Sequence, residues 1–318
     1  MKKILSFTAI ILCTLLLLPL TALKTNKNSF VSALSPAALT NEKTEIFKLY
    51  NTKTQKTEEI SARDYLFGVI AAEMPALYHE EALKAQAVAA YTFALYRKTE
   101  NADKEYDITD NHLSDQSYIS KAEAQIRWGS NAEIYTQKIN KVLDETEGYV
   151  MTYQNKPILS VYHAISYGKT ETAQNIWGKD YPYLQSVESY GDKLCEGYIS
   201  TLSVPQEKFK ELLKDKIDFS ANPEITISVP KTTDAGTVES IKICNVDLKG
   251  SEIRDIFSLR SSNFIIENKD GNFNFTVYGY GHSVGLSQNG ADYMANGGSD
   301  FKEILSHYYK NCKIEKIS

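Results

Sequence analysis

The acidic residue Glu73 ends a predicted helix on the same face as three apolar side chains. Ser61 can cap the start of this helix, and Pro75 disfavours helical geometry in the residue before it. Four residues at spacing i, i+3, i+4 and i+7 share one stripe: Leu66, Val69, Ile70 and Glu73. Poor solvation raises the pKa of a carboxyl group, as a general acid at neutral pH requires. The pattern alone leaves the alternative that Glu73 turns to solvent or pairs with a basic residue.

A second group of chemically capable residues lies in the glycine-rich segment 279–291. Its glycines allow a tight turn and a close approach of the backbone to a ligand. His282, Ser287 and Gln288 would then lie near the start of the following helix, where they could bind sugar hydroxyls or support an acid. The alternative is a left-handed turn followed by an ordinary capped helix.

A third candidate is the segment from His163 to Glu171, which leaves a predicted strand and enters a loop. Ser166 near His163 suggests a serine nucleophile, but no Gly-x-Ser-x-Gly turn accompanies it, so the sequence argues against a Ser–His hydrolase.

The sequence also argues against a metal centre. The five histidines form no ligand pattern such as HExxH. The acidic group around His112, which includes Asp107, Asp110 and Asp115, lacks the glycine and final glutamate of a calcium loop. We therefore expect no metal and no cofactor.

Composition describes a globular protein without a broad basic surface. The chain has 318 residues, 42% hydrophobic and 24% charged, with a net charge of −5, which argues against nucleic acid as the main partner. The 21 tyrosines suit carbohydrate stacking but equally suit half-buried sheets. Beyond the N-terminal segment, Cys195, Cys244 and Cys312 allow one disulfide at most.

The N-terminal segment is long and apolar. Ile4 to Leu23 carry no charge and follow two lysines, which predicts a membrane anchor over residues 1–23 with the rest of the chain extracytoplasmic. A cleaved signal peptide is the alternative. Residues 24–43 then form a linker, 44–312 the catalytic region, and 313–318 a tail.

The remaining pattern predicts an α+β fold rather than regular βαβ units. Beyond the helix ending at Glu73, helices are expected over 80–95, 131–147, 284–295 and 301–309. A polar surface loop is expected over 101–120. Strands are expected over 44–50, 224–229 and 237–248, with hairpins over 149–165 and 263–278.

Several motifs together resemble the stage II sporulation protein D family, over residues 44 to 312. They are Ala71-Ala72-Glu73-Met74-Pro75, the run from Glu81 to Ala90, the loop from Ser166 to Glu171, Tyr181-Pro182-Tyr183-Leu184, and the run from Gly281 to Gln288. The resemblance implies a peptidoglycan lytic transglycosylase acting at the sporulation septum and engulfing membrane. It implies glycan strands stripped of peptides by an amidase, stage II sporulation protein P, and recruitment by the membrane protein stage II sporulation protein M.

The resemblance also implies roles for individual residues. Glu73 matches the catalytic acid, which protonates the bond between N-acetylmuramic acid and N-acetylglucosamine and then takes a proton from the 6-hydroxyl as a 1,6-anhydro ring closes. A water-using glycosidase would normally need a second carboxylate. The expected substrate-binding residues are Lys84, Tyr91, Ser166, Tyr167, Tyr183, His282, Ser287 and Gln288.

This chain departs from the family pattern at a few positions. Tyr91 stands where most relatives have Arg, and Tyr167 where Gly is usual. Some relatives carry a zinc site in the loop corresponding to 107–116, and here Thr109 and Asp115 replace its cysteines. Because such departures could disable the chemistry, the alternative function is a non-catalytic glycan-binding scaffold that positions the amidase.

Overall fold

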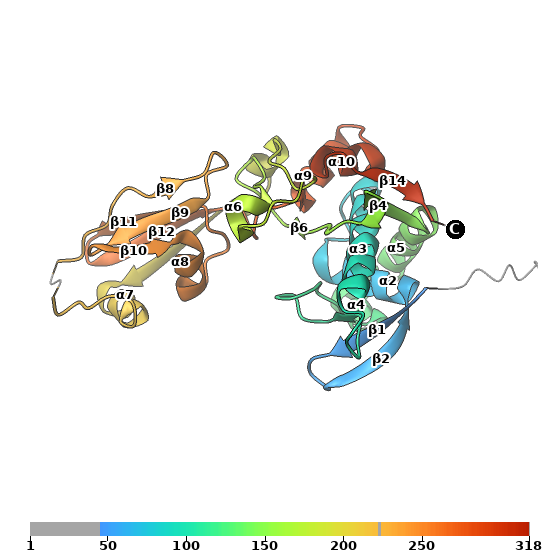
Figure 1. The fold of residues 1–318 in the computed structure, drawn as a ribbon, viewed down its shortest axis with the longest axis horizontal. Helices are drawn as coiled ribbons and strands as arrows, with labels where there is room; N and C mark the ends of the chain where they lie inside the picture. Colours follow the sequence, from blue (N-terminus) through green and yellow to red (C-terminus); the bar gives the residue numbers. More distant parts are fainter. Residues whose placement is uncertain (1–44, 222–223, 318) are drawn as a thin grey trace, which may run out of the picture. The chain divides into compact units, whose positions relative to one another are not determined.

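The structure, a computed structural model, describes residues 45–221 and 224–317 (Figure 1). Helices and small sheets are mixed along the chain, which confirms the expected α+β class. The predicted anchor at 1–23 and the linker at 24–43 lie outside the described residues. Within the described ranges, no helix is both long enough and apolar enough to cross a membrane.

A first hydrophobic core surrounds helix α3 (Glu80–Glu100). Six alanines of α3 are buried, which lets neighbouring helices approach its backbone closely. Helices α2 and α5 contact α3 and each other, α9 and α10 also contact α3, and α4 contacts α2 and α5 (Figure 1). The bounds of these helices are Ala62–Glu73 for α2, Lys121–Trp128 for α4, Ala132–Thr146 for α5, Gln288–Asn296 for α9 and Phe301–Tyr308 for α10.

Three small sheets complete this first core. In the first, β1 (Ile46–Asn51) pairs antiparallel with β2 (Lys56–Ser61) and parallel with β3 (Ile108–Thr109). The other two sheets have the orders β14-β4-β5 and β13-β6. The bounds of their strands are Tyr149–Tyr153 for β4, Lys156–Pro157 for β5, Tyr162–His163 for β6, Leu286–Ser287 for β13 and Lys313–Lys316 for β14.

A second hydrophobic core comprises residues between Val204 and Val277. Two three-stranded sheets with the orders β11-β12-β7 and β10-β9-β8 pack with helices α7 and α8, and the rings of Phe209 and Phe273 stack at 3.8 Å. The bounds are Ile199–Pro205 for β7, Gln206–Leu213 for α7, Lys231–Thr232 for β8, Val238–Ile243 for β9, Val246–Lys249 for β10, Gly250–Phe257 for α8, Phe264–Lys269 for β11 and Asn272–Tyr278 for β12.

Short helical turns join these elements. They are η1 (Gly129–Asn131), α6 (Ala173–Trp177) and η2 (Tyr190–Leu194).

Local sequence explains how α2 places Glu73. The Ser61 hydroxyl accepts a hydrogen bond from the Asp64 N–H at 3.1 Å and caps the helix. At the other end, Met74 is extended (φ −131°, ψ 135°) because Pro75 follows it. Glu73 is therefore the last helical residue, as expected.

Five predicted elements differ from the structure. The single strand expected over 237–248 is a hairpin of β9 and β10, because Cys244 and Asn245 turn the chain with positive φ values. Residues 158–165 do not complete a hairpin with β4, because β6 pairs in parallel with β13 instead. The tail expected at 313–318 contains β14, which pairs with β4. The segment 224–229 makes one isolated bridge rather than a strand. The loop over 101–120 was expected at the surface, but it contains β3 and the buried side chain of Gln116.

Candidate functional site

A cavity of about 410 Å³ contains Glu73. Its lining comes from the end of α2, from α3, from the loop before α4, from the β6 region, from the turn before β13 and from the start of α9. The lining residues are Ala72, Glu73, Phe93, His112, Asp115, Gln116, Ser117, Val161, Tyr162, His163, Ala164, Tyr280, Gly281, His282 and Gln288. Residues far apart in the sequence thus surround one carboxyl group.

Glu73 is partly buried and held by a backbone group. The Ser117 N–H donates a hydrogen bond to Glu73 Oε1 at 2.6 Å. Burial raises the pKa of Glu73, while the hydrogen bonds from Ser117 and the nearby His112 lower this pKa to a smaller extent. The expectation of a raised pKa is confirmed, with poor solvation as its main cause.

Two tyrosines and a glutamine form a hydrogen-bonded chain beside Glu73. Tyr162 Oη donates to Gln116 Oε1 at 2.9 Å, and Gln116 Nε2 donates to Tyr65 Oη at 2.9 Å. Burial is the main cause that raises the pKa of both tyrosines, and the charge of Glu73 adds to it. The wall around Glu73 is therefore polar but carries no charge from these groups.

Asp115 is the second carboxyl group in the cavity lining, and both of its oxygens are bonded. Oδ1 accepts from Arg97 Nε at 2.6 Å, and Oδ2 accepts from the N–H and the hydroxyl of Thr109. Its side chain has no exposed surface. Asp115 therefore fixes the shape of the loop and is less suited than Glu73 to exchange a proton with a ligand.

Two histidine rings lie 5.8 Å apart in the cavity. His282 Nδ1 accepts from the Val284 N–H at 3.1 Å, and its ring lies 5.2 Å from that of Trp177. His163 Nδ1 lies 3.1 Å from the Val284 carbonyl oxygen. Burial lowers the pKa of His282 to about 3 and that of His163 to about 4, so both rings are neutral at pH 7.

Ser166 and Ser287 meet at the buried carboxyl group of Asp192. The hydroxyl and N–H of Ser166 donate to Asp192 Oδ2 at 2.5 and 2.8 Å, and the Ser287 hydroxyl donates to Oδ1 at 2.6 Å. Neither serine belongs to the cavity lining. Because the Ser166 hydroxyl is bonded to Asp192 and not to a histidine, the structure also argues against a Ser–His hydrolase.

The glycine-rich segment forms the left-handed turn and the capped helix of the second interpretation, and the binding roles of its residues stay predictions. Gly279, Gly281 and Gly285 have φ values of 78°, 113° and 72°, and Ser287 caps α9. At the same time His282 and Gln288 line the cavity. A side chain at Gly281 would come within 2.8 Å of His163 Cβ, so this glycine lets the turn approach β6.

Lys84 and Tyr91 lie outside the cavity lining. Lys84 forms ion pairs with Glu81 and Glu145, and the Tyr91 ring packs edge-to-face on Phe47 at 6.3 Å. At 100° per residue, Lys84 is half a turn away from Phe93, the residue of α3 that faces the cavity. The structure does not bring these two residues to Glu73.

Tyr167 and Tyr183 also lie outside the lining. The Tyr167 ring stacks on Tyr198 at 6.3 Å and contacts Tyr278 edge-on at 5.2 Å. Tyr183 is buried, and its hydroxyl accepts from the Leu159 N–H at 3.1 Å. Their roles as substrate-binding residues stay predictions.

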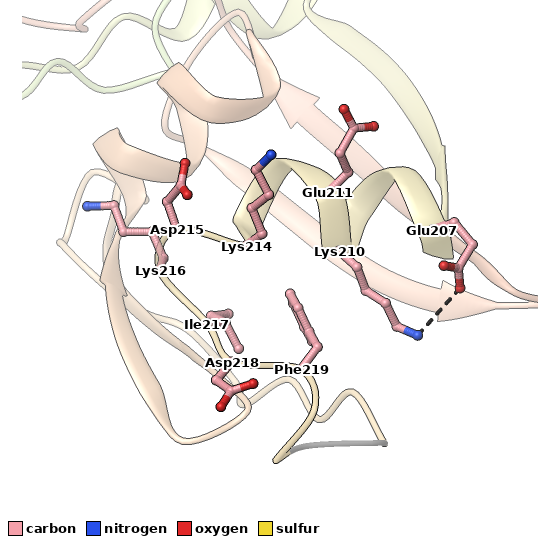
Figure 2. A pocket seen from close by; sticks show the side chains of 9 residues that line it. All are labelled: Glu207, Lys210, Glu211, Lys214, Asp215, Lys216, Ile217, Asp218 and Phe219. Carbon is pink, nitrogen blue, oxygen red and sulfur yellow. Dashed lines mark hydrogen bonds and ion pairs between the residues drawn. The ribbon is translucent and has the colours of Figure 1, made fainter.

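A second, open hollow of about 630 Å³ lies beside α7 (Figure 2). Lysines and acids alternate around it, and an ion pair joins two of them, Lys210 and Glu207, at 3.4 Å, while Lys216 pairs with Glu252 of α8 at 2.7 Å. None of the predicted site residues lines it, and it resembles a solvated charged surface. We therefore place the site at the Glu73 cavity.

Sequence reasoning missed three cavity residues that the structure makes important. Gln116 and Ser117 lie in a stretch whose polar composition is typical of a surface loop. His163 was considered only for its position after a strand and as a neighbour of Ser166, and it was not among the predicted site residues. Among the described residues, no three His, Cys, Asp or Glu side chains are placed to hold a metal ion, and Cys195, Cys244 and Cys312 are free.

Comparisons with known proteins agree on one class. A family model described as stage II sporulation protein matches residues 50–153, which contain Glu73, α2 and α3. Stage II sporulation protein D of Bacillus subtilis is 36% identical over 272 residues, 84% of this chain and 78% of that protein. Stage II sporulation protein D of Bacillus amyloliquefaciens is 34% identical, with the same shares covered. The amidase enhancer of Bacillus subtilis is 27% identical over 77% of this chain and 39% of its own length.

The family model and the stage II relatives thus define the class: a sporulation protein. More narrowly, the chain belongs to the stage II sporulation protein D family, as its motifs predicted.

Proposed function

We propose that this protein is a lytic transglycosylase that cleaves peptide-free glycan strands of peptidoglycan, with Glu73 as its single acid. The observation that carries the proposal is the position of Glu73: a carboxyl group with a pKa raised by burial, in a cavity of about 410 Å³ whose other carboxyl group, Asp115, is paired with Arg97. Such a group keeps its proton at a higher pH than an exposed glutamate, which suits a general acid.

The reaction needs no second carboxylate. Glu73 gives its proton to the glycosidic oxygen as the bond to C1 of the muramic acid breaks. The resulting carboxylate takes the proton of the sugar's 6-hydroxyl as that oxygen bonds to C1. Asp115, the other carboxyl group in the lining, has both oxygens bonded, which supports a scheme with one acid.

The proposed setting follows from the family and from the N-terminal sequence. Residues 1–23 would anchor the chain in the cell membrane, with the catalytic region extracytoplasmic at the sporulation septum and engulfing membrane. The proposed partners are the amidase stage II sporulation protein P and the membrane protein stage II sporulation protein M. The amidase would supply the peptide-free strands that the cavity then receives.

A glycan-binding scaffold that positions an amidase is the second candidate. One observation favours it: a relative with 27% identity is named amidase enhancer. In that case the cavity would bind glycan without cleaving it, and Glu73 would act as a hydrogen-bonding group.

The two candidates separate in a cleavage assay. Purified peptide-free glycan strands are incubated with the wild type, with Glu73→Gln, and with Glu133→Gln as a matched control, because Glu133 is an exposed glutamate on α5. A transglycosylase releases soluble fragments with the wild type and the control, and Glu73→Gln reduces the rate. Glycan binding without fragments, with or without added amidase, would favour the scaffold instead.

A further inference from the structure

His163 combines deep burial with an unusual hydrogen-bonding state. It ends strand β6, is 4% exposed and faces the Glu73 cavity. Its Nδ1 lies 3.1 Å from the Val284 carbonyl oxygen, which can only accept a hydrogen bond. Nδ1 therefore carries the hydrogen, and Nε2 of the neutral ring presents a lone pair.

No hydrogen-bond partner reaches His163 Nε2 from the described part of the chain, although this atom is buried. Most buried polar atoms in proteins have a hydrogen-bond partner, so a buried acceptor without one is an exception that a bound ligand can explain. The burial that lowers the pKa of the ring to about 4 keeps Nε2 an acceptor at neutral pH.

The neighbouring His282 provides a contrast. Its Nδ1 accepts from the Val284 N–H at 3.1 Å, so the hydrogen of the neutral ring is on Nε2, which can only donate. Of the two rings in the cavity, His163 is the one with an acceptor available to a ligand.

We propose that His163 Nε2 binds the substrate directly, by accepting a hydrogen bond from a hydroxyl or amide N–H group of the sugar next to Glu73. Sugars of peptidoglycan carry both kinds of donor. A neutral acceptor suits them better than a charged group, because it binds a donor without altering the charge around Glu73. This inference rests on the proposed function, since it requires a glycan in the Glu73 cavity.

Two substitutions of His163 separate substrate binding from support of the fold. In His163→Asn the side-chain amide can still donate to the Val284 carbonyl, but the cavity loses its acceptor. In His163→Gln the amide oxygen can reach the position of Nε2, so the acceptor is retained. Both are made in a Glu73→Gln parent, so that bound strands are not cleaved, and binding of peptide-free glycan strands is measured by calorimetry.

We expect His163→Asn to weaken binding roughly 10-fold, the effect of losing one buried hydrogen bond, and His163→Gln to restore most of it. Equal binding by His163→Asn and the parent would overturn the proposal. So would the reverse order, in which Asn binds as the parent does and Gln does not, because that order indicates a purely structural role.

A measurement on the parent itself completes the test. With ¹⁵N-labelled histidine, the His163 Nε2 resonance is expected to move to lower frequency when glycan is added, as a nitrogen that gains a hydrogen bond does. If calorimetry shows binding but the Nε2 resonance does not move, only the proposed role of His163 is overturned. A parent that binds no glycan at all overturns the proposed function as well, so the two failures are distinguishable.

Discussion

The Ser117 N–H donates a hydrogen bond to Glu73 Oε1 at 2.6 Å. This bond joins the end of α2 to the loop before α4, two segments that are 44 residues apart. Because a backbone N–H cannot rotate away as a side chain can, it holds the carboxyl group in one orientation inside the cavity. The loop is thus part of the site.

The hydroxyl of Ser117 should set the pH range of activity. Hydrogen bonds from Ser117 lower the pKa of Glu73, so Ser117→Ala is expected to raise this pKa further. The reaction needs protonated Glu73, so the limb on which kcat/KM falls with rising pH should move to higher pH. A pH profile of kcat/KM checks this, with Ser120→Ala, which removes the α4 cap, as control. A limb that stays in place or moves to lower pH would contradict the assignment.

Glu73 should also reduce the stability of the fold at neutral pH. A carboxyl group whose pKa is higher in the folded than in the unfolded state binds more protons when folded. Stability then falls as pH rises from the unfolded pKa through the raised folded pKa. We therefore expect Glu73→Gln to be more stable than the wild type at pH 7, with the difference vanishing below the unfolded pKa of about 4.3. Urea unfolding of both proteins at pH 7 and at a pH below about 4.3 tests this. Equal stability of the two proteins at pH 7 would argue against a poorly solvated carboxylate.

Gly68 should resist substitution although it lies within α2. Alanine normally stabilises a helix by about 1 kcal/mol relative to glycine. Here a Cβ would overlap the Ile119 carbonyl oxygen and the Tyr118 ring, next to Ser117. Overpacking of this kind destabilises by about 1–3 kcal/mol, so the net effect of Gly68→Ala should be a loss of stability. The displaced loop should also reduce activity. A Gly68→Ala variant that is both more stable and fully active would contradict the described loop position.

Asp192 should be essential for folding rather than for chemistry. Asp192→Ala leaves the N–H and the hydroxyl of Ser166 without their acceptor and leaves the Ser287 hydroxyl only the longer contact to the Ala164 carbonyl, which should destabilise by about 3 kcal/mol or more. Asp192→Asn keeps an oxygen for Ser166 and an amide for Ser287, so it should lose less than half as much. Thermal unfolding of the two variants compares them. An equal loss of stability in Asp192→Ala and Asp192→Asn would contradict this prediction and would mean that the negative charge of Asp192 is required.

The helical part of the site was predictable from sequence because its signals are local. The Ser61 cap, the Pro75 stop and the apolar stripe together placed Glu73 at the end of α2, and the hairpin expected over 263–278 is present as β11 and β12. Each of these features depends on neighbours within a few residues. The poor solvation of Glu73 followed from the same stripe.

The rest of the site depends on contacts between distant segments. Gln116 looks like a loop residue until Tyr65 and Tyr162 supply its buried hydrogen bonds. The parallel pairing of β6 with β13 cannot be read from either short strand, yet it brings His163 beside His282. Ser166 was expected to bind substrate because of its motif, and its bonds to buried Asp192 became visible only in three dimensions.

The chemical nature of the product ends distinguishes a lytic transglycosylase from a hydrolase. Peptide-free glycan strands are digested with the wild type and with Glu73→Gln, and the fragments are analysed by mass spectrometry. We expect fragments ending in 1,6-anhydro-N-acetylmuramic acid from the wild type, each lighter by one water than a fragment with a reducing end. We also expect Glu73→Gln to form them at least about 100-fold more slowly, the loss expected for a general acid. Reducing ends from the wild type, or undiminished cleavage by Glu73→Gln, would contradict the proposed function.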